Sequence, residues 1–80
     1  MREYGRDHEL VRAVCNSCKK EMRVEQGILK EGIFEGIQTF GYFSKKDGIT
    51  HKFDLCEECY DKMTHTFAIP VTETEEKELL

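Results

Sequence analysis

Four cysteines in two pairs are the residues of this chain whose type and spacing suggest chemistry. Cys15 and Cys18 enclose two residues, as do Cys56 and Cys59, and 37 residues separate the pairs. This spacing lets neighbouring thiolates bind one tetrahedral ion, and four sulfur ligands favour zinc. We therefore expect one structural Zn²⁺ held by all four cysteines. Four protein ligands leave no coordination position open for a substrate, so we expect no catalysis there.

Paired cysteines also form disulfides, iron sites and redox-active dithiols. Residues 1–7 are charged and no apolar secretory segment follows them, so we expect a cytoplasmic protein whose thiols stay reduced. No βαβ pattern surrounds either pair, as a thioredoxin-like motif requires. Iron-binding knuckles usually have glycine where Lys19 and Tyr60 stand. Zinc is the favoured metal, and a zinc-release thiol switch is one alternative function.

The three histidines add no catalytic motif to the cysteines. His51 lies five residues before Cys56, but four thiolates already fill a tetrahedral site, so we expect it to be a packing residue. His8 lies near the N-terminus and His65 near the end of an expected helix. The chain is therefore not expected to be an enzyme.

Length and charge limit the class of protein further. Eighty residues form one small domain that buries too little surface for stability by apolar contacts alone, so a metal staple is expected. The formal net charge is −4, and four thiolates around one divalent ion bring it to about −6. Nucleic acid is therefore not the favoured partner, although Lys19, Lys20 and Arg23 form a local basic edge. No apolar run is long enough to span a bilayer, so no membrane partner is expected.

The pattern of apolar and turn residues predicts a small α+β domain. Residues 9–14 have strand composition and lead into a knuckle at residues 15–18, from which residues 22–24 return as a short strand. Residues 27–36 are expected to form a loop with apolar anchors. Runs 37–43 and 49–53 predict a β-hairpin around the Asp47-Gly48 turn, with alternate residues on opposite faces.

The second cysteine pair is expected at the start of a helix over residues 55–65. Asp54 followed by Glu57 matches an N-cap with a reciprocal carboxylate. In the first turn, free N–H groups and the helix dipole are expected to lower the pKa of Cys56 and Cys59. An apolar stripe of Leu55, Cys59, Met63 and Phe67 is expected to be buried. Pro70 ends any helix, and residues 67–72 are expected to form an edge strand.

These elements define one domain with two flanking segments. We expect a flexible N-terminus over residues 1–8, a zinc-binding domain over 9–72 and an acidic tail over 73–80.

The order of a cysteine knuckle, a hairpin and a helix carrying the second pair resembles four-cysteine zinc fingers of the treble-clef or zinc-ribbon type. The resemblance covers about residues 10–66 and implies that Cys15 and Cys18 are knuckle ligands and Cys56 and Cys59 ligands at the helix start. The chain departs from the treble-clef pattern in lacking a knuckle proline and in having Lys19 where glycine usually follows. Residues 40–61 are also similar to small uncharacterised bacterial and phage proteins, which implies no known activity.

The aromatic residues are expected mainly in the core, and any exposed on the hairpin would mark a protein-docking or self-association surface. They are Phe34, Phe40, Tyr42, Phe43, Phe53, Tyr60 and Phe67. The favoured function is a non-catalytic zinc-binding module that docks to another protein as an adaptor or regulator. A nucleic-acid-associated regulator using the Lys19–Arg23 edge is the alternative, besides the thiol switch. Self-association through the hairpin edge is a further possibility.

Overall fold

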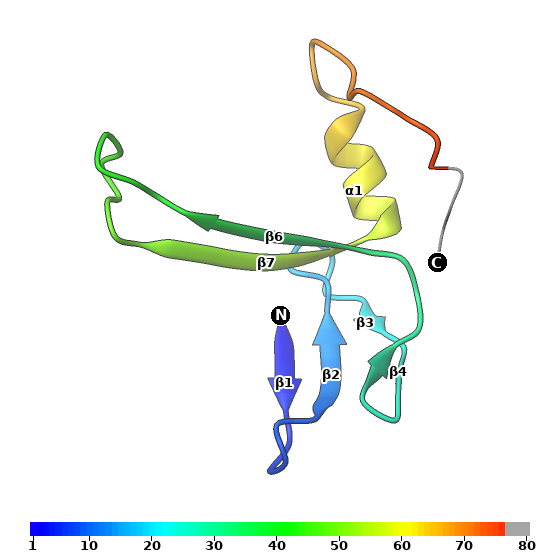
Figure 1. The fold of residues 1–80 in the computed structure, drawn as a ribbon. Helices are drawn as coiled ribbons and strands as arrows, with labels where there is room; N and C mark the ends of the chain where they lie inside the picture. The colour runs from blue at the N-terminus through cyan, green and yellow to red at the C-terminus, as the bar shows by residue number, and fades with distance from the viewer. Residues whose placement is uncertain (77–80) are drawn as a thin grey trace.

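The chain forms short antiparallel strands followed by a helix, and the expected α+β class is confirmed (Figure 1). The structure is a computed structural model that describes residues 1–76. Strands β1 (Arg2–Tyr4), β2 (Leu10–Val14) and β3 (Glu21–Met22) form one sheet in that order. The other elements are the pair β4 (Val24–Glu25) and β5 (Ile28–Leu29), the pair β6 (Ile33–Thr39) and β7 (Thr50–Cys56), and helix α1 (Glu57–Thr64).

The N-terminal segment differs from the flexible arm expected for residues 1–8. Strand β1 pairs antiparallel with β2, and Arg2 lies opposite Ala13. Met1 extends the ladder, because the Val14 N–H donates to the Met1 carbonyl at 2.8 Å. A three-residue strand that begins with charged side chains is too short to show periodicity. The pairing of β1 with β2 could therefore not be predicted from the sequence.

The stretch expected as a loop over residues 27–36 is mostly β-structure. Val24 pairs with Leu29 across the β4–β5 hairpin, whose turn residues Gln26 and Gly27 have φ of 51° and 76°. Two successive positive φ values match the tight turn that joins the strands of a hairpin with a two-residue loop. Because Gln-Gly is a weaker turn signal than Asn-Gly or Asp-Gly, the hairpin is not evident in the sequence.

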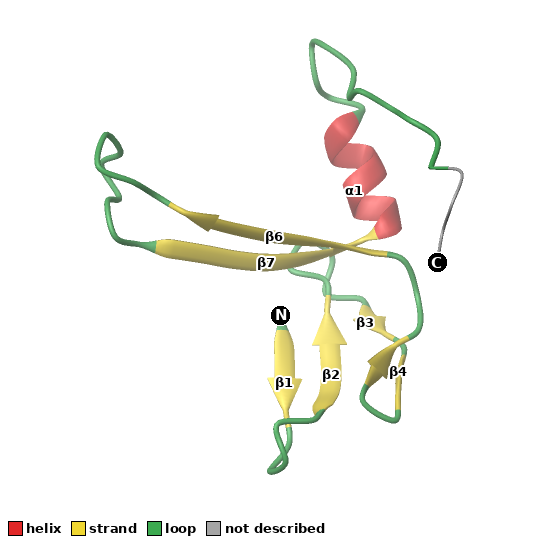
Figure 2. Ribbon diagram, viewed as in Figure 1, coloured by secondary structure: helices red, strands yellow, loops and turns green. Residues whose placement is uncertain are grey.

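The predicted long hairpin is present, but its first strand lies earlier in the chain than expected. Strand β6 ends at Thr39, which pairs with Thr50, so Tyr42 and Phe43 lie in the connecting loop. We call residues 40–49 the tip loop. In the view shared by Figures 1 and 2, the tip-loop end of the β6–β7 hairpin extends away from the N-terminal sheet and from α1. A radius of gyration of 15.3 Å, against about 12 Å for a compact chain of this length, agrees with this projection and with the extended segment that follows α1 (Figure 1).

Helix α1 begins two residues later than predicted, and its cap differs. Cys56 is the N-cap residue and makes no side-chain cap hydrogen bond, whereas Asp54 is still in β7. The acidic Glu57 and Glu58 occupy the first turn, where their negative charges interact favourably with the positive end of the helix dipole. Residues 67–72 form no strand, and Phe67 is exposed rather than buried. Of the expected tail, residues 77–80 lie outside the described part of the chain.

The core is small and is built around the cysteines. Its buried members are Ala13, Cys15, Met22, Leu55 and Cys56, with Phe34, Cys59, Tyr60 and Met63 among the partly buried side chains against it. The expectation that most aromatic residues fill the core is wrong, because Tyr42, Phe43, Phe53 and Phe67 are exposed. Since two of the five core residues are cysteines, whatever the sulfur atoms bind also holds the core together. In residues 1–76 no helix is long and apolar enough to cross a membrane.

Candidate metal centre

The first cysteine pair lies in a tight turn between β2 and β3. The Cys15 N–H donates to the Lys20 carbonyl and the Lys19 N–H to the Cys15 carbonyl, both at 2.9 Å, and these bonds close the knuckle. Lys19 has a φ of 69°. This left-handed conformation is the one that glycine adopts most readily. The chain therefore forms the expected knuckle although lysine occupies the position where glycine is usual.

The second pair lies where β7 passes into α1. Cys56 is the last residue of β7 and Cys59 is in the first helical turn. Two hydrogen bonds link β7 to the knuckle, since the Asn16 N–H donates to the Asp54 carbonyl at 2.8 Å and the Asp54 N–H donates to Asn16 Oδ1 at 2.9 Å. These bonds place the two cysteine pairs next to each other, although 37 residues separate them in the sequence.

All four predicted ligands meet at one point, with their Sγ atoms within 4.8 Å of one another. The Sγ atoms of Cys18 and Cys56 are 3.8 Å apart, which matches the edge of about 3.8 Å that a tetrahedron with Zn–S bonds of about 2.3 Å would have. All four cysteines are free thiols. Cys15 and Cys56 are buried, whereas Cys18 is exposed. The four cysteines are thus positioned to bind one metal ion.

Backbone N–H groups stabilise the thiolate form of Cys15. Its burial opposes ionisation, but N–H groups of Cys18, Cys56 and Ser17 point at its sulfur and lower the pKa of the Cys15 thiol to about 6. Negative charge is therefore already stabilised at this position near neutral pH. The backbone N–H groups around the knuckle therefore favour the thiolate of Cys15.

Cys59 behaves in the opposite way, and the expectation of a lowered pKa at the helix start is wrong for it. The Ser17 hydroxyl favours its thiolate, but the Cys56 sulfur, burial and the sulfurs of Cys18 and Cys15 outweigh this and raise the pKa of the Cys59 thiol to about 12. Four sulfur atoms this close cannot all become negative without a compensating charge. The cluster therefore has the electrostatics of a cation site.

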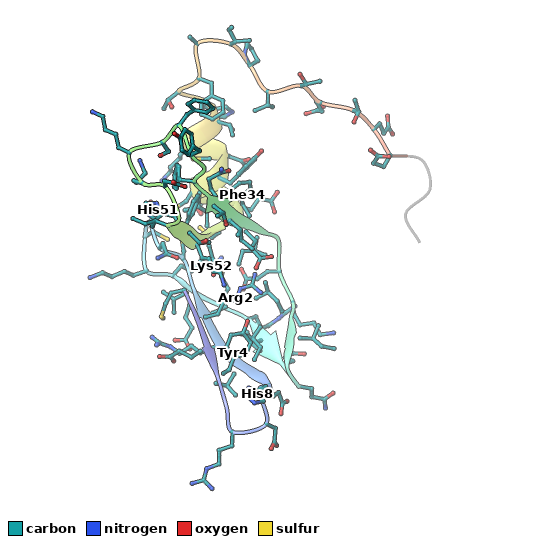
Figure 3. The ribbon with its side chains drawn as sticks, turned by 60° about the vertical axis from the view of Figure 1, so that its left-hand side comes forward. Arg2, Tyr4, His8, Phe34, His51 and Lys52 are labelled. Atoms are coloured by element: carbon teal, nitrogen blue, oxygen red, sulfur yellow. The ribbon has the colours of Figure 1, made fainter. Side chains whose placement is uncertain are left out.

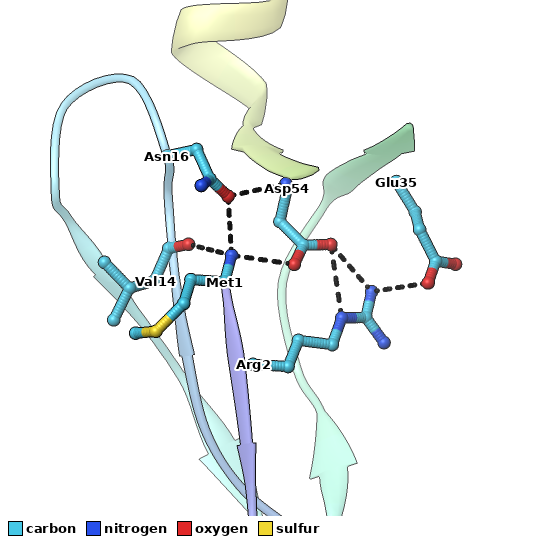
Figure 4. A network of polar contacts seen from close by, with 6 residues as sticks. All are labelled: Met1, Arg2, Val14, Asn16, Glu35 and Asp54. Atoms are coloured by element: carbon cyan, nitrogen blue, oxygen red, sulfur yellow. Dashed lines mark hydrogen bonds and ion pairs between the residues drawn. The ribbon is translucent and has the colours of Figure 1, made fainter. Parts of the chain in front are cut away.

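A network of polar groups that was not evident in the sequence joins the N-terminus, the knuckle and β7 (Figure 4). The Met1 ammonium donates to the Val14 carbonyl at 2.8 Å, to Asn16 Oδ1 at 2.6 Å and to Asp54 Oδ2 at 2.9 Å. The Arg2 guanidinium contacts Asp54 Oδ1 at 3.1 Å and Glu35 at 3.5 Å. In the sequence, Asn16 is marked only by its place next to Cys15 and Asp54 only as a candidate helix N-cap, and neither signal indicates these contacts.

The Asp54 carboxylate is the centre of this network. Burial opposes its ionisation, but hydrogen bonds from the Met1 ammonium and from Arg2 outweigh burial and lower the pKa of the Asp54 carboxyl. Asp54 belongs to β7, Asn16 to the knuckle and Arg2 to β1, so the network joins three segments of the chain. It fixes the backbone from which Cys15 and Cys56 project.

Other residues singled out in the sequence lie outside the sulfur cluster. His51 is exposed on β7 and its ring meets Phe40 edge-on, with centroids 5.2 Å apart. His65 is the C-cap of α1. In the basic edge, Lys20 pairs with Glu31 at 2.9 Å and Arg23 with Glu25 at 3.5 Å, so two of its three cations face carboxylates.

In comparisons with protein-family models, curated proteins and solved structures, no match to this chain was found. The resemblances to treble-clef fingers and to small bacterial and phage proteins therefore stay predictions. The metal centre rests on the geometry and electrostatics of its own residues.

Proposed function

We propose that the chain is a non-catalytic module in which Cys15, Cys18, Cys56 and Cys59 bind one structural Zn²⁺. The observation that carries the proposal is the meeting of four free thiols within 4.8 Å, with one edge at the length expected for tetrahedral zinc. Thiolate-only ligand sets select zinc or iron over hard cations such as Mg²⁺. Zinc is the better candidate because structural zinc sites with four protein ligands are almost always tetrahedral and zinc has a single oxidation state.

Cobalt substitution tests the ligand set directly. Refolding the chain with Co²⁺ is expected to give the ligand-field and thiolate charge-transfer bands of a tetrahedral tetrathiolate site, and added Zn²⁺ is expected to displace the cobalt. Replacing Cys18, the exposed ligand, with serine is expected to weaken Co²⁺ binding and shift these bands, because a hard oxygen then replaces one soft ligand. A wild-type spectrum typical of octahedral cobalt would refute the tetrathiolate site.

The order of the elements supports a treble-clef type of finger. The first ligand pair lies in a knuckle between β2 and β3, the β6–β7 hairpin follows, and the second pair lies at the start of α1. In such an arrangement the metal joins the two ends of the structured region and is itself closed to substrate. We therefore assign the zinc a scaffolding role and no enzymatic one.

We infer that this scaffold docks to another protein. Supporting this is a groove of about 330 Å³ between β1 and the hairpin, lined in part by Tyr4, Ile37 and Lys52. Tyr4 and Ile37 are more than half exposed, at 58% and 56%, and Figure 3 shows Arg2 and Tyr4 of β1 beneath Lys52. Exposed apolar side chains beside charged ones such as Arg2 and Lys52 are a combination found at protein-docking sites.

Charge insertion into the groove tests the docking role. Ile37→Glu is expected to abolish capture of the partner that wild-type protein recovers, and the interaction should be reproduced with the purified partner. Val11→Glu is the matched control, since Val11 is 57% exposed but lies on β2, outside the groove. Equal binding by wild type and Ile37→Glu would remove the groove from the docking hypothesis.

One observation favours a second function, the thiol switch. Cys18 is exposed, which gives an oxidant direct access to a metal ligand. If the site is a switch, mild peroxide releases zinc from wild-type protein and a reductant restores binding. Zinc that stays bound under peroxide, measured with a chromogenic chelator, would rule the switch out.

A further inference from the structure

An aromatic stripe follows one face of the β6–β7 hairpin. Phe34 stacks near Tyr60 of α1 with ring centroids 5.0 Å apart, and near Phe53 at 6.0 Å. Farther out, Phe40 meets His51 at 5.2 Å. Phe53 lies opposite Gly36, two residues from Phe34, so the rings share a face by strand alternation. Figure 3 shows Phe34 and His51 along this ribbon.

The stripe ends in two of the most exposed aromatic rings of the described chain. Tyr42 is 82% and Phe43 99% exposed, and both lie in the tip loop. Their rings meet edge-on, with centroids 5.2 Å apart, and at this exposure the Phe43 ring is almost fully open to solvent. A ring this exposed offers an apolar face on which a planar ligand can stack.

The outer part of the hairpin has a positive formal charge, whereas the rest of the chain has a negative one. Residues 38–52 hold three lysines and one acid, a formal charge of +2, so the other residues together carry −6 and the whole chain −4. In contrast to Lys20 and Arg23, neither Lys45 nor Lys46 has a carboxylate partner among residues 1–76. Lys46 lies over the Phe40 ring at 4.4 Å. Its ammonium is therefore next to the aromatic stripe.

We propose that this hairpin face and its tip loop bind single-stranded nucleic acid. Bases would stack on Phe43 and on the exposed rings behind it, and Lys45 and Lys46 would contact the phosphates. Open aromatic faces beside unpaired lysines are the combination that holds single strands with little sequence preference. The acidic body restricts the contact to the projecting hairpin, so the expected site covers only a few nucleotides.

A lipid surface is the less favoured ligand of the same chemistry. Ser44, Lys45, Lys46 and Asp47 follow Phe43 directly. Inserting the Phe43 ring into a bilayer would carry this charged turn toward the hydrocarbon, at a large desolvation cost. A nucleic-acid strand leaves the turn in water.

Fluorescence anisotropy with a labelled oligodeoxythymidine tests the proposal on the zinc-loaded full chain. Saturable binding at low salt is expected, and Tyr42→Ala with Phe43→Ala should weaken it by roughly 5- to 150-fold, the range for removing one stacked base. Phe67→Ala, which removes another exposed ring, should change nothing. Lys45→Gln with Lys46→Gln should reduce the slope of log affinity against log salt by about 0.7 for each phosphate that the protein no longer neutralises.

The charge control is Lys30→Gln with Lys62→Gln, which removes two exposed lysines outside the hairpin. A loss of affinity equal to that of the Lys45 and Lys46 variant would mean diffuse attraction and would overturn the proposal. So would the absence of binding at low salt. Binding to phosphatidylserine vesicles that depends on Phe43, without oligonucleotide binding, would assign the tip to a lipid surface and equally overturn it. None of these outcomes bears on the zinc site or the Tyr4–Ile37 groove.

Discussion

At the residue scale, the two cysteines with shifted pKa values make metal binding depend on pH in a definite direction. Cys15, with a pKa of about 6, is already a thiolate at neutral pH, whereas Cys59, with a pKa of about 12, holds its proton until a cation displaces it. Zinc binding near neutrality should therefore release a proton from Cys59.

The expected consequence is that zinc affinity rises with pH. Each proton released contributes about a tenfold increase per pH unit, and below about pH 6 the slope should steepen because Cys15 is then protonated too. Competition with a chelator of known affinity on either side of neutrality measures this slope. An affinity that does not vary with pH would show that Cys59 is no ligand or is already ionised.

Lys19 is a second residue with a testable conformation. Its φ of 69° is costly for a residue with a Cβ, so Lys19→Gly should raise the free energy of unfolding of the zinc-loaded protein by up to about 1 kcal/mol. Lys30→Gly is the control, because Lys30 is exposed and has no positive φ. We expect it to destabilise slightly. Chemical denaturation of both variants gives the comparison. If Lys19→Gly lowers the free energy of unfolding, the backbone at Lys19 is not strained.

At the element scale, the β6–β7 hairpin depends on a close contact across its strands. A Cβ at Gly36 would lie 2.5 Å from the Phe53 ring, whereas one at Gly41 would meet nothing within 4 Å. Gly36→Ala should therefore cost about 1–3 kcal/mol of stability, and Gly41→Ala little. Thermal unfolding of the zinc-loaded variants compares them. If both behave alike, Phe53 does not cover Gly36 in solution.

The link between β1, the knuckle and β7 provides the other prediction at this scale. Asp54→Asn removes the charge that pairs with both the Met1 ammonium and Arg2, so we expect a loss of about 1–3 kcal/mol. Glu35→Gln, which removes the longer and more exposed contact of Arg2, is the control and should cost less. If urea denaturation shows equal losses of stability for the two variants, Asp54 is not the main carboxylate of this network.

The sequence predicted the parts of the fold that depend on short-range signals. The two Cys-x-x-Cys pairs, strand β2, the Asp47-Gly48 hairpin and a helix that carries Cys59 follow from spacing, alternation and turn chemistry. Strand β1 and the role of Asp54 did not, because they depend on contacts between residues far apart. Asp54 resembles a helix cap locally, but its carboxylate is already bound to Met1 and Arg2. Tyr42 and Phe43 have strand composition, yet the β6 register places them in the tip loop.

At the scale of the whole molecule, the metal centre is expected to determine whether the chain folds. The core is small and includes Cys15 and Cys56, and residues 37–53 of the extended hairpin add surface without adding a buried residue. A domain of this kind has little apolar stabilisation to offset chain entropy. Structural zinc supplies about 10–16 kcal/mol of apparent binding free energy in zinc-finger peptides, which exceeds the net stability of most small domains.

The most direct test is to follow zinc content and folding together in one titration. Gently purified protein should contain one zinc per chain by elemental analysis, and a strong chelator should remove the zinc and the ordered circular dichroism spectrum in parallel, with both restored by added Zn²⁺. Cys56→Ser should resemble the chelated protein from the start. A metal-free chain that keeps the native spectrum would contradict the account.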